Sequence, residues 1–321
     1  MPTTQPSHHP RRLVALAACG VLVATAAWMV WHARGPDSPV IDSADEQSAA
    51  PAIDLNDPPE SYDTFLHVRQ TGGCRLTRAA AIGWLDVHTR QRRALPADQA
   101  HHLMDVLRTG GHEAWEAGYR QHLYNSAFNA LHLCDIAEDL TRLLHDLARH
   151  DDDRVMRLYA LQHIGMQRES GQLKNPLAGE IHATLQQIAA SPESDVAGTA
   201  IHLLTEWDGR AAAAPPSVLE LAAHSAADRS RPVDVRVSAI HSAGAAALGT
   251  ARAIAADTTE PVILRKAAIA RIGHHGDQGD LATLKTLGAE SARLAQAADP
   301  ALESLQNRLR NPSAPAPIPY P

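Results

Sequence analysis

The chain of 321 residues has few aromatic side chains and no excess of basic charge. Aromatic residues make up 4% of it while alanine is abundant, a composition that disfavours a β-sandwich and favours many closely packed helices. The formal net charge of −7 excludes a protein whose bulk charge attracts nucleic acid, so we expect no nucleic-acid partner. Apolar residues still reach 45%, which provides a buried core and excludes wholesale disorder.

The strong catalytic and cofactor motifs are missing as well. The sequence contains no nucleophile elbow, P-loop, dinucleotide-binding fingerprint, HExxH pair or CxxC pair. We therefore expect a protein that is not an enzyme, has no cofactor and carries no catalytic residue.

Cysteine is scarce, with Cys74 and Cys134 the only thiols beyond the first 60 residues. An extracytoplasmic compartment would allow these two to form a disulfide. If the helices that carry them stack in parallel, however, the two residues lie at opposite helix ends, beyond the roughly 7 Å that a disulfide can bridge. Two free thiols are therefore favoured, and the disulfide stays the alternative.

One uncharged segment covers residues 13–31. At 1.5 Å per residue its 19 residues reach about 28 Å, close to the roughly 30 Å of a bilayer core. Arg11 and Arg12 precede it and acidic residues follow it, which places residues 1–12 in the cytoplasm. We expect a single-pass transmembrane helix in a bacterial inner membrane, with residues 32–321 in the periplasm or outside the cell.

Two other fates of this segment stay open. Residues 24–26 (ATA) fit a signal-peptidase site, after which the segment would be removed. Residues 16–19 (LAAC) resemble a lipobox, in which Cys19 would be lipidated. Both alternatives export residues 61–321, as the anchor does.

Two segments show no apolar period. Residues 32–60 are rich in Pro, Asp, Ser and Ala, which predicts a disordered linker. Residues 311–321 contain five prolines and predict an extended Pro-rich tail.

A short string recurs seven times in the rest of the chain. It begins with alanine, continues with Leu or Ile, and has an apolar or small residue at its fifth position. The seven alanines, 29 to 49 residues apart, are Ala81, Ala130, Ala160, Ala200, Ala239, Ala268 and Ala301. Positions one, two and five share a helix face, so the string predicts a packing stripe in which alanine lets a neighbouring helix approach closely.

Further residues mark the ends of the predicted helices. Amphipathic segments at 136–149, 218–227 and 281–287 predict partner helices between the strings. Capping and proline chemistry predict helix starts after Asp151–Asp153 and at Pro232, Pro261 and Pro300, and helix ends at Gly165, Gly244 and Gly273. An arginine stands three residues before four of the alanines, at Arg78, Arg157, Arg236 and Arg265.

Residues 153–161 (DRVMRLYAL) and 264–273 (LRKAAIARIG) resemble bacterial HEAT-like repeats of the PBS-lyase type. The resemblance implies an all-α fold, an α-solenoid of about six or seven helix pairs, and a scaffold or binding surface. Residues between 86 and 130 depart from the repeat. We therefore expect an N-terminal helical cap over 61–135 and HEAT-like repeats over 136–310.

Histidines provide the candidate polar sites. His132, His202 and His241 occupy the third position of the string, which faces away from the packing stripe. A row of imidazoles can bind a metal or sense pH, but helices about 8–10 Å apart separate them too far for a shared ion. His274, His275 and Asp277 form a second group with metal-ligand chemistry, although a connecting loop of this kind is favoured over a metal site.

Trp115 and Tyr119 lie one helical turn apart within the expected cap. They fill its core or are exposed as a recognition patch, and we take them as candidate protein-binding residues together with His132, His202 and His241. The leading hypothesis is a membrane-anchored, extracytoplasmic HEAT-like scaffold that binds another envelope or secreted protein. An accessory subunit or chaperone of an envelope or secreted enzyme is the alternative, and a metal-dependent hydrolase is the third.

Overall fold

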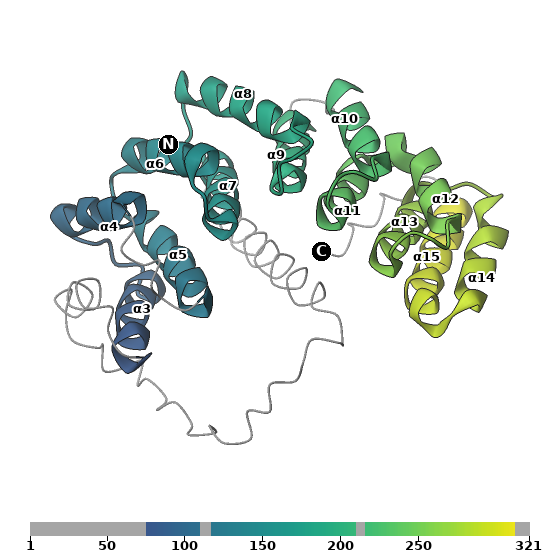
Figure 1. Cartoon of the computed structure of the whole chain (residues 1–321), viewed down its shortest axis with the longest axis horizontal. Helices are drawn as coiled ribbons and strands as arrows, with labels where there is room; N and C mark the ends of the chain where they lie inside the picture. Colours follow the sequence, from purple (N-terminus) through teal and green to yellow (C-terminus); the bar gives the residue numbers. More distant parts are fainter. Residues whose placement is uncertain (1–74, 110–116, 210–215, 312–321) are drawn as a thin grey trace, which may run out of the picture. The chain divides into compact units, whose positions relative to one another are not determined.

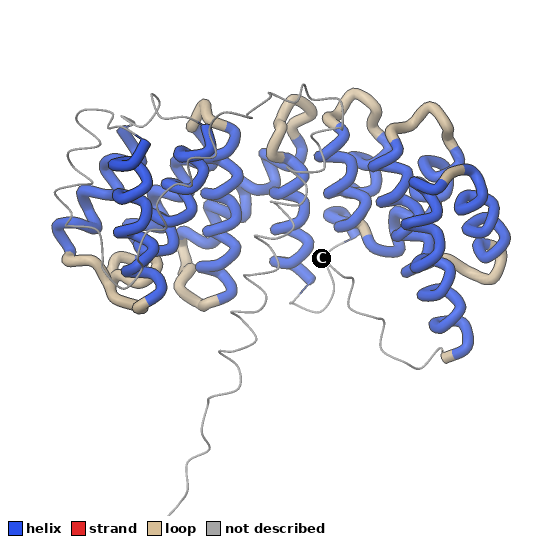
Figure 2. Tube along the Cα trace, turned by 90° about the horizontal axis from the view of Figure 1, so that it is seen from below, coloured by secondary structure: helices blue, strands red, loops and turns tan. Residues whose placement is uncertain are grey.

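All the regular structure described for this chain is helix (Figures 1 and 2). The computed structural model describes residues 75–109, 117–209 and 216–311. Within these ranges there are thirteen α-helices, one short 3-10 turn and no strand. The prediction of an all-α protein is confirmed.

The chain divides into two compact units at Leu177. The first unit contains α3 (Arg75–Arg90), α4 (Ala97–Thr109), α5 (Ala117–Leu131), α6 (Ala137–His150) and α7 (Arg154–Glu169). The helix α8 (Leu177–Ala190) begins at the division. The second unit continues with α9 (Ala197–Gly209), α10 (Pro216–Ala227), α11 (Val233–Ser242), the turn η1 (Gly244–Ala247), α12 (Leu248–Ala256), α13 (Val262–His275), α14 (Asp280–Glu290) and α15 (Ala292–Arg310).

The expected membrane anchor and linker, and the Pro-rich tail beyond residue 311, lie outside the described residues. Among the helices that are described, none combines the length and the apolar character needed to cross a bilayer. The expectations for residues 1–60 and for a cap that ends at residue 135 stay predictions.

The recurring string lies on every second helix, from α3 to α15. All seven string alanines are buried, with at most 5% of their surface exposed. The residue at the fifth position is buried in every copy, and the residue at the second position in all but the last, Leu302. The predicted packing stripe is confirmed because this spacing returns to the same face of a helix at each turn.

Each unit has its own order of packing. In the first unit α3 packs on α5 and α5 on α7, while α4 pairs with α5 and α6 with α7 (Figure 1). In the second unit α9, α11, α13 and α15 pack in succession, and α10, α12 and α14 each pair with the string-bearing helix that follows. Within each unit, the string-bearing helices form one layer and their partner helices form another.

Most of the predicted helix starts are correct. The Asp153 side chain caps α7 by accepting a hydrogen bond from the Val155 amide, and Pro232 and Pro261 stand immediately before α11 and α13. The prediction for Pro300 is wrong, because this residue lies inside α15. Buried residues on both sides of it, Ala298 and Ala301, hold the helix together by packing where the proline removes a backbone donor.

Two of the three glycines predicted to end helices do not. Gly165 lies inside α7, which runs on to Glu169, and the left-handed residue beyond its end is Gly171 with φ 75°. Gly273 lies inside α13, where a Cβ atom would come within 2.6 Å of the Ala301 Cα atom on α15. Gly273 is therefore required for close helix packing. Only Gly244, with φ 57°, has the predicted left-handed backbone, which follows α11.

Candidate functional site

Arginines of the second unit bind the C-terminal ends of neighbouring helices. The last carbonyl groups of a helix have no donor within it, and they form the negative end of the helix dipole. A guanidinium group provides five N–H donors and a positive charge that match this end. Such bonds join Arg231 to Ala189 and Ala190, Arg236 to Ala226, Arg265 to Ala255, Arg271 to His241, and Arg308 to Gly276.

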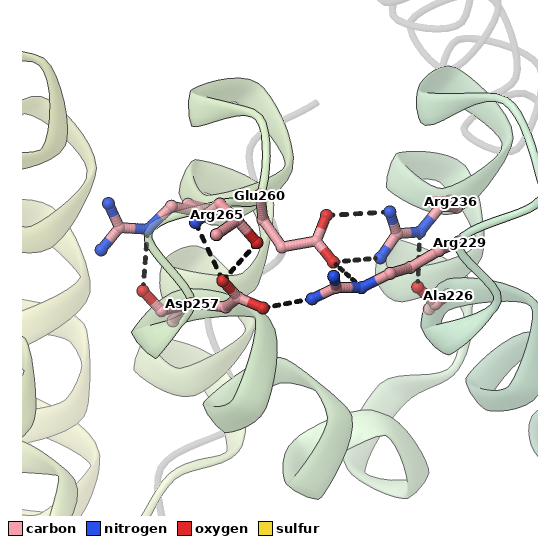
Figure 3. A network of polar contacts seen from close by, with 8 residues as sticks. Ala226, Arg229, Arg236, Asp257, Glu260 and Arg265 are labelled. Carbon is pink, nitrogen blue, oxygen red and sulfur yellow. Dashed lines mark hydrogen bonds and ion pairs between the residues drawn. The ribbon is translucent and has the colours of Figure 1, made fainter.

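Arg236 is the most buried member of this set, with 3% of its surface exposed. Its Nε atom donates to the Ala226 carbonyl at 3.0 Å, and its two terminal nitrogens donate to both carboxylate oxygens of Glu260 at 2.9 and 2.8 Å. Arg229 approaches the same carboxylate at 3.1 Å, so Glu260 lies between two guanidinium groups (Figure 3). The hydrogen bonds from Arg236 lower the pKa of Glu260 and keep it charged.

Arg265 repeats this arrangement one helix pair further along the chain. Its Nε atom donates to the Ala255 carbonyl at 2.9 Å, and its Nη2 atom donates to Glu290 at 2.7 Å. Both arginines stand three residues before a string alanine, at Ala239 and Ala268. The arginine that precedes a string alanine by three residues thus has a structural role in the second unit, where it binds both the C-terminal end of a helix and a carboxylate.

Arg271 and Arg308 differ from these two, because among the described residues no carboxylate forms an ion pair with either. Arg271 has 7% of its surface exposed. Its Nη2 atom donates to the His241 carbonyl oxygen, and its Nη1 atom donates to the Nε2 atom of His275 at 3.0 Å. The Nε atoms of both arginines are buried and have no hydrogen-bond acceptor within the described ranges. Burial lowers the pKa of Arg271 to about 10.

Four of the predicted histidines gather near Arg271. His241 lies within electrostatic reach of Arg271, His202 and His274; the residue is exposed at its surface, but burial of its ring lowers the pKa to about 4. Burial, followed by the charge of Arg271, lowers the pKa of His274 and lowers that of His275 to about 4. These two imidazoles are therefore neutral at pH 7. We call Arg271, Arg308, His241, His274 and His275 the arginine–histidine cluster.

Asp277, the carboxylate of the predicted metal group, binds elsewhere. It accepts a hydrogen bond from Arg252 at 2.7 Å and one from the Gly279 amide at 2.8 Å. These contacts hold a connecting loop. In the part of the chain that is described, no three His, Cys, Asp or Glu side chains are grouped so that they could hold a metal ion.

His132 lies in the first unit and takes part in a different contact. Its Nε2 atom is 2.8 Å from the Nδ1 atom of His163, and the two rings stack with their centroids 4.9 Å apart. His163 is buried with 2% of its surface exposed, and His132 is half-buried. The expectation that His132 faces solvent is wrong, because α5 ends at Leu131 and the following turn brings the ring onto α7.

We expect the thermal stability of the first unit to fall as the pH drops from about 6.5 towards 4. Burial lowers the pKa of His132 to about 4 and that of His163 well below its usual value. Unfolded imidazoles take up protons near pH 6.5 while the folded pair stays neutral, so acid favours the unfolded state. Thermal melting followed by circular dichroism between pH 4.5 and 7.5 measures this effect.

Two variants assign the acid sensitivity to the pair. His163→Phe and His132→Gln each remove one buried titrating ring, and each should make the melting temperature depend less on pH. His224→Gln removes an exposed histidine of α10 and should leave the pH dependence unchanged. If His163→Phe and the wild type followed parallel curves, the pair would not be the cause.

The aromatic residues of the first unit divide between core and surface. Trp84, Tyr124 and Phe128 are buried, so these rings fill the core. Tyr119 is half-buried, and the guanidinium carbon of Arg78 lies 5.2 Å from the centre of its ring. Trp115 lies outside the described residues, and whether it contacts a partner stays a prediction.

Cys134 is a buried free thiol next to the carbonyl groups of Leu95 and Ala130. Burial raises the pKa of this thiol, which keeps it protonated at neutral pH. Cys74 lies outside the described residues, so the choice between a disulfide and two thiols stays a prediction.

Comparison with protein-family models, with curated proteins and with solved structures found no match to this chain. The resemblance to HEAT-like repeats therefore rests on the sequence alone, on residues 153–161 and 264–273.

The sequence analysis missed two residues of the cluster. Arg271 stands three residues after a string alanine, and Arg308 lies in the last helix, where the string is least regular. Neither position recurs in the other copies, so no repeated signal distinguished them.

Proposed function

We propose that this chain is an extracytoplasmic HEAT-like scaffold that binds another envelope or secreted protein. The observation that carries the proposal is the burial of the string alanine in all seven copies, on helices that pack in succession within each unit. Helix pairs that bury the same face by stacking form α-solenoids, and α-solenoids commonly present extended surfaces to other proteins. An α-solenoid of about six or seven pairs is part of this proposal.

The proposed contact residues are Tyr119 and Trp115 in the first unit and, as a separate set, His202 and His241 in the second. Tyr119 is half-buried with a stacked arginine, the type of pair that is enriched where proteins bind each other. His241 is exposed at the end of α11. His132 is a weaker candidate because its imidazole contacts His163.

The membrane part of the proposal rests on residues 13–31, whose length and lack of charge suit a single-pass anchor. Residues 32–60 would act as a tether that gives the helical part reach. A reporter that is active only outside the cytoplasm, fused after residue 60, tests this placement.

We expect the aromatic ring of Tyr119 to contribute to partner binding. Tyr119→Ala should weaken capture of the partner from cross-linked membranes by about 2 kcal/mol, the scale of an interface hot spot, without early melting. Trp115→Ala should do the same. Quantitative mass spectrometry of captured proteins, alongside thermal melting of each variant, measures both effects.

Two further variants separate binding from stability. Tyr119→Phe keeps the ring and should retain capture. Tyr124→Ala removes a core ring that is 1% exposed and should cost about 3–5 kcal/mol of stability. If Trp115→Ala and Tyr119→Ala melted as early as Tyr124→Ala, both rings would belong to the core and the proposed surface would be wrong.

A further inference from the structure

Arg271 is a buried cation for which the described residues supply no anion. A buried charge destabilises the fold unless it is paired, and a buried charge that loses its counter-ion destabilises the fold further. The second unit provides an internal comparison, because Arg236 binds Glu260 and Arg265 binds Glu290. Arg252 is paired too, with two carboxylates. Arg271 is about as buried as Arg236 and Arg265, yet among the described residues it donates to a carbonyl oxygen and to a neutral imidazole.

Arg308 adds a second positive charge to the same region. Its charge and that of Arg271 both act on the imidazoles of His274 and His275. The Nε atoms of both arginines lack an acceptor within the described ranges, although each is shielded from solvent. Each guanidinium group thus has one buried donor without an acceptor among the described residues, and arginine is the side chain best suited to bind a carboxylate or a phosphate.

The nearby carboxylate of Asp280 does not fill this role. Both of its oxygens accept hydrogen bonds from Arg252, at 2.9 and 2.7 Å, and one also accepts from the Asp277 amide at 2.7 Å. Arg308 contributes to the low pKa of Asp280, but less than Arg252 does. Asp280 is thus already neutralised by another arginine.

The histidines would complete the site by supplying donors. Because Arg271 donates to the Nε2 atom of His275, the ring proton of neutral His275 is on Nδ1. His241 is exposed beside the group and His274 is half-buried, so an anion could approach from solvent. A bound anion would favour protonation of these rings, and protonation of His275 would break the hydrogen bond that its Nε2 atom accepts from Arg271.

We propose that the arginine–histidine cluster is a binding site for an oxyanion, a carboxylate or a phosphate group. Arg271 would hold the anion at the base of the site, Arg308 would add a second charge, and His274 and His275 would adjust their protonation to the ligand. This site goes beyond the proposed function, because an oxyanion can bind here whether or not a partner protein does.

The test titrates the full chain with two probes, inorganic phosphate and an acetylated, amidated hexaglutamate peptide. Nuclear magnetic resonance of the imidazole protons follows His274 and His275 at several pH values, with each assigned through its glutamine variant. We expect at least one probe to raise the pKa of both rings in a saturable way. Phosphate alone would identify a phosphate site, hexaglutamate alone a carboxylate site, and both a general oxyanion site.

Substitutions show whether binding uses the cluster. Arg308→Gln should weaken binding at least tenfold, and Arg271→Gln should abolish it. Arg293→Gln removes an exposed charge from the same helix as Arg308 and should have no effect. Arg271→Gln and Arg308→Gln each also remove a bond to the end of a helix, at His241 and at Gly276, so thermal melting of each variant is measured beside its binding. The proposal is overturned if neither probe shifts the rings, or if Arg308→Gln binds as well as Arg293→Gln.

Discussion

Replacing Glu260 by alanine is expected to destabilise the second unit by about 3–5 kcal/mol, the range observed when one partner of a buried ion pair is removed. The substitution leaves the guanidinium of Arg236, 3% exposed, with the Ala226 carbonyl as its remaining acceptor among the described residues. It also removes the ion pair between Glu260 and Arg229. Hydrogen exchange of the amides of α11 and α13 measures the loss within this unit, independently of how the first unit unfolds.

Two controls distinguish a buried pair from an ordinary surface pair. Glu138→Ala breaks the exposed i,i+4 pair with Arg142 on α6 and should cost no more than about 0.5 kcal/mol. The double variant Arg236→Met with Glu260→Leu removes both charges and should recover much of the lost stability, because apolar packing often replaces a buried pair without loss. If Glu260→Ala cost as little as Glu138→Ala, the ion pair would not hold these helices together.

Gly273→Ala is expected to destabilise the second unit by about 1–3 kcal/mol through overpacking. The added methyl group would meet the Ala301 Cα atom at 2.6 Å and its carbonyl oxygen at 2.8 Å. Both are backbone atoms of α15, so no side chain can turn aside, and α13 and α15 would have to separate. Chemical denaturation of the variant and the wild type measures the difference.

Gly249→Ala is the matched control for this substitution. Gly249 also lies in a helix, α12, but a Cβ atom there would meet nothing within 4 Å. Alanine should therefore stabilise the helix, by up to about 1 kcal/mol, because it is a better helix former than glycine. Two variants that changed stability in the same direction would contradict the assignment of Gly273 to close packing.

The helices and their buried faces could be predicted from the sequence. The string alanines repeat at positions that share one helix face, so the pattern depends only on the geometry of a single helix. The capping role of Asp153 followed from the same local logic, since a cap bonds to amides within the next turn. These features need no knowledge of which helix packs against which.

Predictions failed where the outcome depended on a neighbouring helix. Gly273 was predicted to end a helix, but it lies inside α13, where the close approach of α15 requires a glycine. Pro300 was predicted to begin a helix, but α15 continues through it because the helix packs on both sides of this residue. His132 was predicted to face solvent, but it meets His163, 31 residues away in the chain. Each error assigned a local cause to a residue whose conformation is determined by a contact distant in sequence.

The sequence by itself therefore determined that the described part of the chain is helical, where α7, α11 and α13 begin, and which residues form the packing stripe, because helix periodicity and capping are local. Only the tertiary structure decided which arginines have a carboxylate partner. Glu260 reaches Arg236 from 24 residues away, whereas no carboxylate among the described residues pairs with Arg271. Charge pairing between helices depends on how far apart and at what angle they pack, and a linear pattern of residues does not encode either quantity.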